Sequence, residues 1–370
     1  MAEQSFSFSL QLWKRLKKNK GALFGIAIIS IAVFISIFGY LLAPDASPNA
    51  DMQTVEIQAK KPGYTQLFLK IPDLKNSFPG SWALTLVSGS AENFRYLPIS
   101  KYAISGDSFL VNKYIDEDTS VIQTYSINQL TNNQQEKLLT QNIITKKYWL
   151  GTDKFGRDIL SRLLIGTRVS LAVGLIAVII SLIIGILLGA VAGYYKGIAD
   201  EIIMWLVNVT WSIPTLLLVF AITLALGKGF WQIFIAVGLT MWVSVARLVR
   251  GQVLALKELE YVQAAKALGL SNSRIIVKHI LPNILGPLMV IAASNFATAI
   301  IVEAGLSFLG IGVQPPQPSW GLMIKENYNF IITHNPLLAL VPGFAIMLLV
   351  LAFNLLGNAL RDAVDVKSPS

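Results

Sequence analysis

Residues 21–43 read GALFGIAIISIAVFISIFGYLLA and contain no charged side chain. At a rise of about 1.5 Å per residue, a helix of this length crosses the roughly 30 Å of hydrocarbon in a bilayer. A cleaved signal peptide would have a shorter apolar core and a small-residue cleavage site, whereas this stretch ends in Tyr40-Leu-Leu-Ala-Pro44. We therefore predict a retained transmembrane helix.

Further uncharged or nearly uncharged apolar runs follow this stretch toward the C-terminus. Five further apolar runs lie at about Val169 to Val191, Ile202 to Leu226, Phe230 to Leu248, Ile284 to Leu306 and Leu337 to Leu356. The composition, with 54% hydrophobic and 14% charged residues, lies outside ordinary globular usage. The predicted fold class is an all-α membrane protein with six transmembrane helices.

The basic residues predict the direction of these helices. The formal net charge is +9, and the excess gathers before the first run and in one later connection. These residues are Lys14, Arg15, Lys17, Lys18 and Lys20, and then Arg247, Arg250, Lys257, Lys266, Arg274 and Lys278. The short connections on the other side contribute only Lys228 and Lys325. The positive-inside rule then places both termini in the cytoplasm, and nucleic acid is not implied as a partner.

The segment from Pro44 to about Lys147 interrupts the membrane pattern. Its β-branched and aromatic runs are Gln66 to Ile71, Trp82 to Val87, Ser108 to Ile115 and Ser120 to Ile127, with turn residues at Pro79-Gly80 and Ser105-Gly106-Asp107. Such runs are typical of strands. We predict an extracytoplasmic β-rich insert between the first two helices.

The sequence gives little support for chemistry carried by this chain. There is no cysteine, and His279 and His334 share no ligand spacing, so we predict no catalytic residue and no metal site. No phosphate-binding G-x-x-x-x-G-K-[ST] motif occurs. A transport subunit therefore fits better than an enzyme.

Residues 260–283 read EYVQAAKALGLSNSRIIVKHILPN and form the most informative connection. We predict one helix over Gly251 to Leu268, a left-handed cap at Gly269, and a second helix that begins after Ser271 and ends before Pro282. The product is a helix-turn-helix elbow. Small Ala264, Ala265 and Ala267 would let another protein approach, while Tyr261 and Leu268 would provide apolar anchors.

This connection resembles the EAA motif of ABC importer permeases, in which Glu-Ala-Ala is followed by Gly and then by Leu-Pro. The matching residues are Gln263-Ala264-Ala265, Gly269 and Leu281-Pro282, with Gln263 at the Glu position. The passages LGTDKFGRDILSR (150–162) and EAGLSFLGIGVQPPQPSWG (303–321) are similar to the C-type subunit of the dipeptide, oligopeptide and nickel branch. The resemblance covers nearly everything except residues 50–145 or so.

The resemblance implies the type I ABC importer fold and a set of partners. These are a B-type second permease subunit, two cytoplasmic ATPase subunits that use ATP and Mg, and an extracytoplasmic substrate-binding protein. The implied coupling residues are Tyr261, Gln263, Ala264, Ala265, Gly269, Leu281 and Pro282. The implied cargo is a peptide, with nickel or another small solute as the alternative. A secondary transporter is a further alternative, although the spans lack acidic residues at mid-depth.

These observations divide the chain into five parts. They are a basic tail and first helix (1–43), the insert (44–147), an amphipathic connection (148–167), a core of five transmembrane helices (168–358) that contains the elbow at 249–283, and a cytoplasmic tail (359–370).

Polar residues within the spans are candidates for the translocation pathway. They are Asn208, Trp211, Asn295, Thr298, Glu303 and Asn354. Hydrogen bonding between helices is at least as good an explanation. For Glu303 we favour pairing with Arg157, Arg162 or Arg168, because ionisable groups near membrane depth are usually paired.

Two more patterns point to structure. Gly185, Gly189 and Gly193 form a small-xxx-small ladder, which fits either a subunit interface or packing within this chain. Asp153 and Asp158 could be read as paired catalytic carboxylates, but capping of the following helix explains them better.

Overall fold

The computed structural model describes residues 12–72, 82–90, 94–106, 108–127, 130, 142–227, 229–333 and 335–364. Pro79, Gly80, Asp107, Lys228 and His334 lie outside these residues. Two compact units divide the chain. We call them the helical unit (Met1–Val33, Val169–Gln314 and Phe344–Ser370) and the sheet unit (Phe34–Arg168 and Pro315–Gly343).

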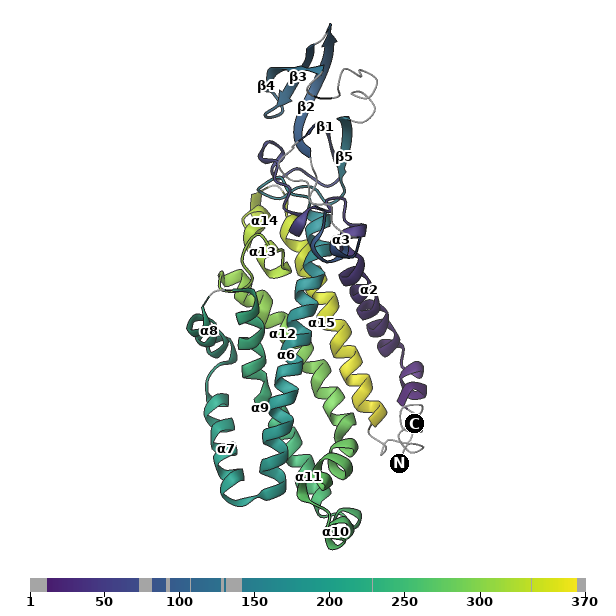
Figure 1. The fold of residues 1–370 in the computed structure, drawn as a ribbon, viewed down its shortest axis with the longest axis vertical. Coiled ribbons are helices and arrows are strands. Elements are labelled where there is room, and N and C mark those ends of the chain that lie inside the picture. Colours follow the sequence, from purple (N-terminus) through teal and green to yellow (C-terminus); the bar gives the residue numbers. More distant parts are fainter. Residues whose placement is uncertain are drawn as a thin grey trace. The chain divides into compact units, whose positions relative to one another are not determined.

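The helices follow the predicted apolar runs (Figure 1). The long ones are α2 (Lys20–Leu42), α6 (Ile159–Tyr195), α9 (Phe230–Lys257), α12 (Leu285–Leu309) and α15 (Leu337–Val364). Within the described residues, five helical stretches are long and apolar enough to cross a membrane, and a bent pair makes up to six. The multi-span prediction is confirmed.

The bent pair corrects the predicted span from Ile202 to Leu226. The chain forms α7 (Gly197–Ser212) and α8 (Thr215–Leu226), which are bent by 98°. Pro214 causes the break, because the residue before a proline avoids helical geometry and Ile213 is extended, with φ −91° and ψ 128°. At about 18 Å, α8 is too short to span a bilayer alone.

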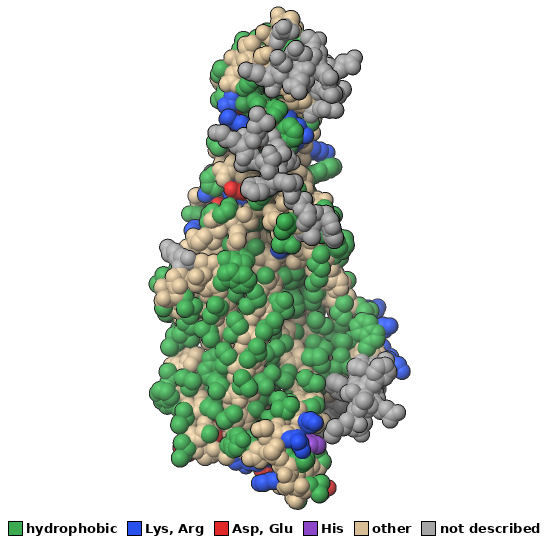
Figure 2. Space-filling view, viewed as in Figure 1, with side chains coloured by type: hydrophobic (Ala, Val, Ile, Leu, Met, Phe, Trp, Pro, Cys, Tyr) green, Lys and Arg blue, Asp and Glu red, His purple; other side chains and the backbone are tan. Residues whose placement is uncertain are grey.

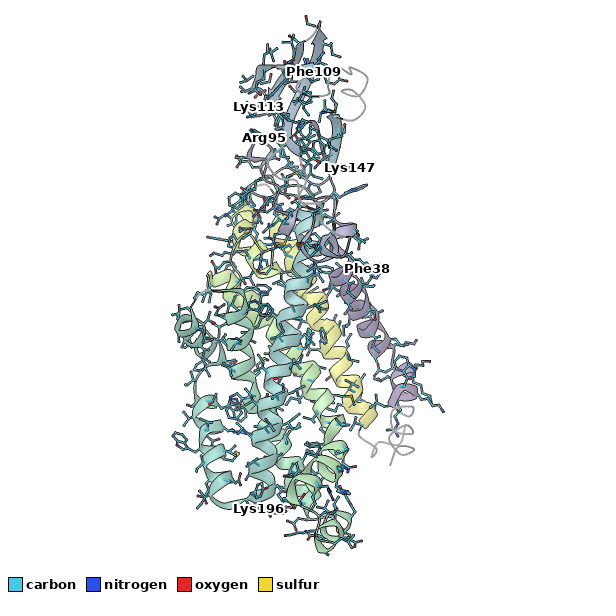
Figure 3. All side chains as sticks on the ribbon, in the orientation of Figure 1. Phe38, Arg95, Phe109, Lys113, Lys147 and Lys196 are labelled. Atoms are coloured by element: carbon cyan, nitrogen blue, oxygen red, sulfur yellow. The ribbon has the colours of Figure 1, made fainter. Side chains whose placement is uncertain are left out.

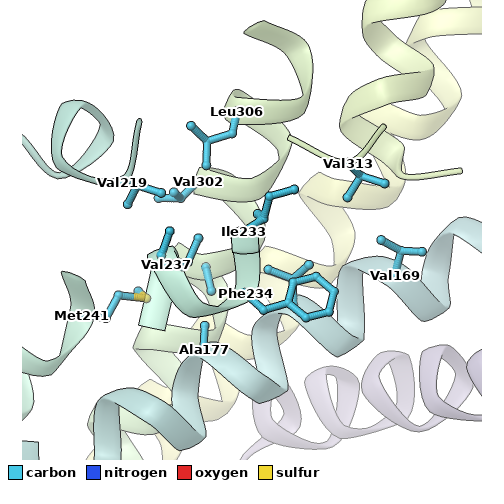
Figure 4. Close-up of a cluster of buried hydrophobic side chains, with 13 residues drawn as sticks. Val169, Ala177, Val219, Ile233, Phe234, Val237, Met241, Val302, Leu306 and Val313 are labelled. Atoms are coloured by element: carbon cyan, nitrogen blue, oxygen red, sulfur yellow. The ribbon is translucent and has the colours of Figure 1, made fainter. Parts of the chain in front are cut away.

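Helix α9 lies at the centre of the helical unit. It contributes Ile233, Phe234 and Val237 to a buried cluster with Ala177 of α6 and Leu306 of α12 (Figure 4). The most apolar window of α9 is 67% buried, whereas that of α2 is 17% buried. Hydrophobic side chains cover the outside of the helices seen in Figure 2, as expected of surfaces that meet lipid.

The sheet unit contains one antiparallel sheet with strand order β4-β3-β2-β1-β5. The strands are β1 (Tyr64–Pro72), β2 (Phe94–Ser105), β3 (Ser108–Tyr114), β4 (Ser120–Ser126) and β5 (Ile143–Tyr148). Three of the four predicted runs, now β1, β3 and β4, are strands. β2 and β5 were not predicted.

Both faces of this sheet carry apolar side chains. Leu69 packs with Phe109 on one face, and the neighbouring Phe68 packs with Tyr148 on the other. Phe109, labelled in Figure 3, is fully buried. Since neighbouring residues of a strand point to opposite faces, β1 contributes to a core on each side.

The remaining predicted strand, Trp82 to Val87, is wrong. Trp82 to Ser88 forms a helix, α3. Within the sheet unit, Arg168 Nη1 donates to the carbonyl oxygens of Leu86 and Val87 at 3.2 and 3.0 Å. These are among the last carbonyls of α3, which have no partner inside the helix, so a tertiary contact supports a conformation that the local pattern does not specify.

Candidate functional site

The predicted elbow is present, but its first helix is broken. Helix α9 ends at Lys257, and α10 covers Glu260–Ala267. The side-chain amide of Gln263 donates to the carbonyl oxygen of Lys257 at 2.9 Å. This bond satisfies one of the carbonyls left open where α9 ends, so Gln263 holds the corner between the two helices.

The second half of the elbow differs from the prediction at its far end. Gly269 has φ +79°, as predicted, and Ser271 precedes α11 (Asn272–Ile275) without a capping bond from its side chain. Contrary to the prediction, the helical structure does not end before Pro282. It passes through a π-helical turn, η4 (Ile276–Ile280), and a 3₁₀ turn, η5 (Leu281–Ile284), into α12. Pro282 lies at the start of η5, where a missing N–H is tolerated.

A small apolar core holds the elbow together. Val262 and Ala265 of α10 are buried with Ile275, Ile280 and Val253. Ala265 is only 6% exposed, so it faces this core and not a docking surface. Ala264 and Ala267 are exposed, so of the three alanines only these two lie on the outer surface of the elbow.

The outer surface of the elbow carries two exposed apolar side chains. Leu268 is 82% exposed and Tyr261 is 40% exposed. Asn283 Nδ2 donates to Tyr261 Oη at 3.2 Å and to the carbonyl oxygen of His279 at 2.7 Å. Partial burial raises the pKa of Tyr261, although the bond from Asn283 acts in the opposite direction. The ring is therefore held in place as a neutral phenol.

The elbow is also bound to the end of α6. Tyr194 Oη donates to Asn272 Oδ1 at 2.9 Å, and Lys257 Nζ donates to the carbonyl oxygen of Tyr194 at 2.6 Å. Through these bonds and its core, the elbow joins the ends of α6, α9 and α12.

Two of the six predicted pathway residues meet around a third side chain. Arg247 Nη2 donates to Asn208 Oδ1 at 3.1 Å, and the guanidinium carbon lies 3.6 Å from the centre of the Trp211 ring. The predicted basic connection begins at Arg247, yet the structure places this residue inside α9, facing α7. The sequence could have indicated this position, because Arg247 lies within the predicted apolar run, one turn before Arg250.

The other four candidates lie on α12 and α15. Asn295 and Glu303 are buried, whereas Thr298 and Asn354 are exposed. Thr298 Oγ1 donates to the carbonyl oxygen of Ser294 at 3.0 Å within its own helix. Glu303 accepts a hydrogen bond from Ser307 Oγ at 2.6 Å.

Two of the three arginines predicted as partners of Glu303, Arg157 and Arg162, lie against other carboxylates within the sheet unit. Arg157 donates to Asp153, Asp51 and Glu326 at 2.6, 3.0 and 2.6 Å. Arg162, whose side chain is fully buried, lies 3.6 Å from Asp51 and Glu326 and 3.9 Å from Asp153. We call these five residues the charge cluster. Sequence reasoning missed Asp51 and Glu326, which are far from the motif along the chain.

Asp153 and Asp158 do not form a catalytic pair. Asp153 accepts from the backbone N–H groups of Phe155 and Arg157. Asp158 accepts from Ser161 N at 2.8 Å and from Ser161 Oγ, at the start of α6. Burial raises the pKa of Asp158, and the bonds from Ser161 act in the opposite direction. Both carboxylates stabilise the turn that leads into the helix.

The glycine ladder packs within the helical unit. A Cβ atom added at Gly185 would lie 2.5 Å from Val245 Cβ. At Gly189 it would lie 2.5 Å from the carbonyl oxygen of Ala246, and at Gly193 it would lie 2.8 Å from the carbonyl oxygen of Arg250. All three neighbours belong to α9. Hence α6 and α9 approach backbone to backbone along this face.

No group of three or more potential metal ligands occurs among the residues that the structure describes. The candidate functional residues are those of the elbow and the polar group around Arg247.

Comparison with known proteins gives two family matches. Residues 185–367 match the family described as binding-protein-dependent transport system inner membrane component. Residues 7–62 match the N-terminal TM domain of oligopeptide transport permease C.

Individual proteins are similar as well. A dipeptide transport system permease protein from Alkalihalophilus pseudofirmus is 40% identical over 80% of this chain and 95% of its own length. A glutathione transport system permease protein from Pectobacterium atrosepticum is 44% identical over 60% of this chain and 74% of its own length. Among solved structures, the inward-facing MetNI methionine ABC transporter aligns with 55% of this chain and 96% of its own at 20% identity, with a TM-score of 0.45.

Proposed function

Because the chain belongs to the family of binding-protein-dependent transport system inner membrane components, we propose that it forms half of the channel through which an ABC importer takes up peptides. The chain is a multi-pass membrane permease subunit of a bacterial ABC importer, part of a complex with ATPase subunits. Its family lacks a catalytic domain. ATP and Mg accordingly act at the partner ATPases.

The relatives support a peptide as cargo. Their names specify dipeptide and glutathione transport, and the N-terminal match is to an oligopeptide permease domain. These substrates share a peptide backbone with charged ends. The remaining partners in this proposal are a B-type second permease subunit and an extracytoplasmic binding protein.

The orientation in the inner membrane follows from charge. Basic residues precede α2 and occupy the connection that contains the elbow. The positive-inside rule assigns both regions to the cytoplasm. On this assignment the sheet unit's strands lie outside and the elbow faces the ATPases.

The elbow is the coupling element in this proposal, and one observation carries the assignment. A knob that presents Tyr261 and Leu268 to solvent is bound through its core and its hydrogen bonds to the ends of three long helices. Exposed apolar anchors on a rigid support are typical of a docking surface. Movement of a docked ATPase would thus reach α6, α9 and α12 together.

Replacement of Leu268 tests this assignment. Leu268→Asp places a charge where an apolar anchor should enter an ATPase pocket, so we expect ATPase recovered with the purified permease to fall at least tenfold. Insertion and yield should stay normal, because the side chain is 82% exposed and packs on nothing essential.

Ile332→Asp is the matched control. Ile332 is 91% exposed but lies in α14 (Phe330–Thr333), which the proposed orientation places outside. This variant should retain its ATPase. Normal ATPase recovery and normal transport by Leu268→Asp would contradict the coupling role.

A further inference from the structure

Arg247 lies inside a candidate membrane span and forms no ion pair with any residue that the structure describes. Among the described residues, its partners are an amide and an aromatic ring, and none of the ion pairs includes it. Its Nε atom is buried and has no hydrogen-bond partner there. Charged groups within spans are costly and usually paired, so an unpaired one marks a functional site.

Arg250, one turn farther along α9, shows the ordinary arrangement. Its Nε and Nη2 atoms donate to the two carboxylate oxygens of Asp200 at 2.5 and 2.6 Å. Both arginines therefore hold α7 against α9, but within the described residues only Arg250 is paired with a carboxylate. The difference between them is a missing carboxylate.

The guanidinium of Arg247 lies beside the break between α7 and α8. Side chains on a helix point toward its N-terminus, so Arg247 reaches away from Arg250 and toward Trp211, which is two residues before the break. Trp211 is 59% exposed, and Asn208 is exposed beside it. Broken membrane helices are where transporters place polar groups for their substrates.

We propose that Arg247 binds the C-terminal carboxylate of the peptide as it passes through the channel, with Asn208 and Trp211 holding the guanidinium in position. This inference rests on the proposed peptide function.

The chemistry suits a transient contact. A guanidinium has five N–H donors in a planar fork that matches a carboxylate, and Asn208 takes only one of them. Trp211 covers one face of the fork and leaves its edge available. Because no acidic residue in the described part of the chain forms an ion pair with Arg247, a carboxylate can enter the site and leave again.

An acidic side chain of the second permease subunit would offer the same chemical group. Exposure of Trp211 and Asn208 next to a helix break favours the substrate, because a permanent ion pair needs no open aromatic platform.

The experiment uses the complete importer in proteoliposomes, with binding protein saturated by either trialanine or trialanine amide. Wild-type protein should import the acid about tenfold faster than the amide, the usual effect of one charged hydrogen-bonded contact. Arg247→Gln should slow the acid about tenfold and leave the amide unchanged, so that the preference disappears. Arg247→Lys should keep part of it.

Arg250→Gln is the matched control, since it removes a cation from the same helix face but one already paired with Asp200. It should change the import rates of both peptides by the same factor. Equal slowing of both peptides by Arg247→Gln, no effect on either, or loss of the second permease subunit during purification would each overturn the inference. A wild-type importer that moves neither peptide would instead contradict the proposed function.

Discussion

The side-chain amide of Gln263 closes the corner between α9 and α10. Its Nε2 atom donates to the carbonyl oxygen of Lys257 at 2.9 Å. A glutamate, which the EAA motif has at this position, carries no N–H at neutral pH and could not make this bond. The departure from the motif therefore has a local structural role.

Gln263→Glu should loosen this corner. Loss of one hydrogen bond costs about 1 kcal/mol, so we expect amide hydrogen exchange in residues 258–268 to accelerate about fivefold. Mass spectrometry of the purified protein would measure this.

Gln263→Met serves as the comparison, because it also removes the donor but adds no charge. It should accelerate exchange to a similar extent. Unchanged exchange in both variants would show that the bond does not hold the corner, and stronger ATPase binding by Gln263→Glu alone would indicate a contact with the ATPase instead.

The candidate site could be predicted only where local pattern decides it. The exposed anchors Tyr261 and Leu268 and the left-handed Gly269 follow from their neighbours in sequence. The surroundings of Arg247 do not, because hydropathy treats a basic residue at the end of an apolar run as part of a loop. Glu326 was missed for a similar reason, since its partner Arg157 lies in a distant segment.

Among the elements, α6 and α9 approach each other backbone to backbone along the glycine ladder. The carbonyl oxygens of Ala246 and Arg250 occupy the space that side chains at Gly189 and Gly193 would need. Such close contact between backbones is how membrane helices gain packing energy without a hydrophobic driving force. The ladder fixes the register of α6 on α9.

Gly189→Val should disrupt this contact. Overpacking of a tight interface costs about 1–3 kcal/mol, so we expect a lower midpoint of thermal unfolding in detergent and a reduced yield. Gly251→Ala is the control, because a Cβ atom there meets nothing within 4 Å. That variant should be neutral or slightly more stable, since alanine favours a helix. Equal midpoints of thermal unfolding and equal yields for the two variants would argue against a tight contact between α6 and α9 at Gly189.

The elements that sequence reasoning got wrong were decided by tertiary contacts or by single residues. The run from Trp82 fits a strand or a helix by composition, and contacts from Arg168 support the helix. β2 contains Arg95, Pro98 and Lys101, which hide its alternation. Pro214 breaks the predicted span between α7 and α8, but the size of the bend depends on contacts that the local sequence does not specify.

On the scale of the whole molecule, the sheet begins and ends at neighbouring positions. Tyr64 and Tyr148 are directly paired across β1 and β5, and Leu67 pairs with Thr145 three residues farther in. Most of the sheet can therefore be removed at one place without displacing the chain on either side.

We expect a variant in which Asn-Gly replaces residues 68–144 to keep this short hairpin, because a two-residue turn closes paired strands. It should insert normally and retain its ATPases. If the sheet docks the binding protein, uptake driven by that protein should fall at least tenfold, and its co-purification should be lost. Normal uptake would exclude a docking role for the sheet.

The charge cluster has a consequence for the order in which the protein is made. Asp51, Asp153, Arg157 and Arg162 leave the ribosome early, but Glu326 is synthesised some 160 residues later. Asp51 and Asp153 then already balance the charge of the two buried arginines, but Arg157 lacks the Glu326 oxygen that accepts from its Nη2 atom. A buried donor without its acceptor opposes closure. We expect the sheet unit to stay open and hydrated until the later helices have been made. A truncated chain would expose this unfinished cluster to the proteases that survey new membrane proteins.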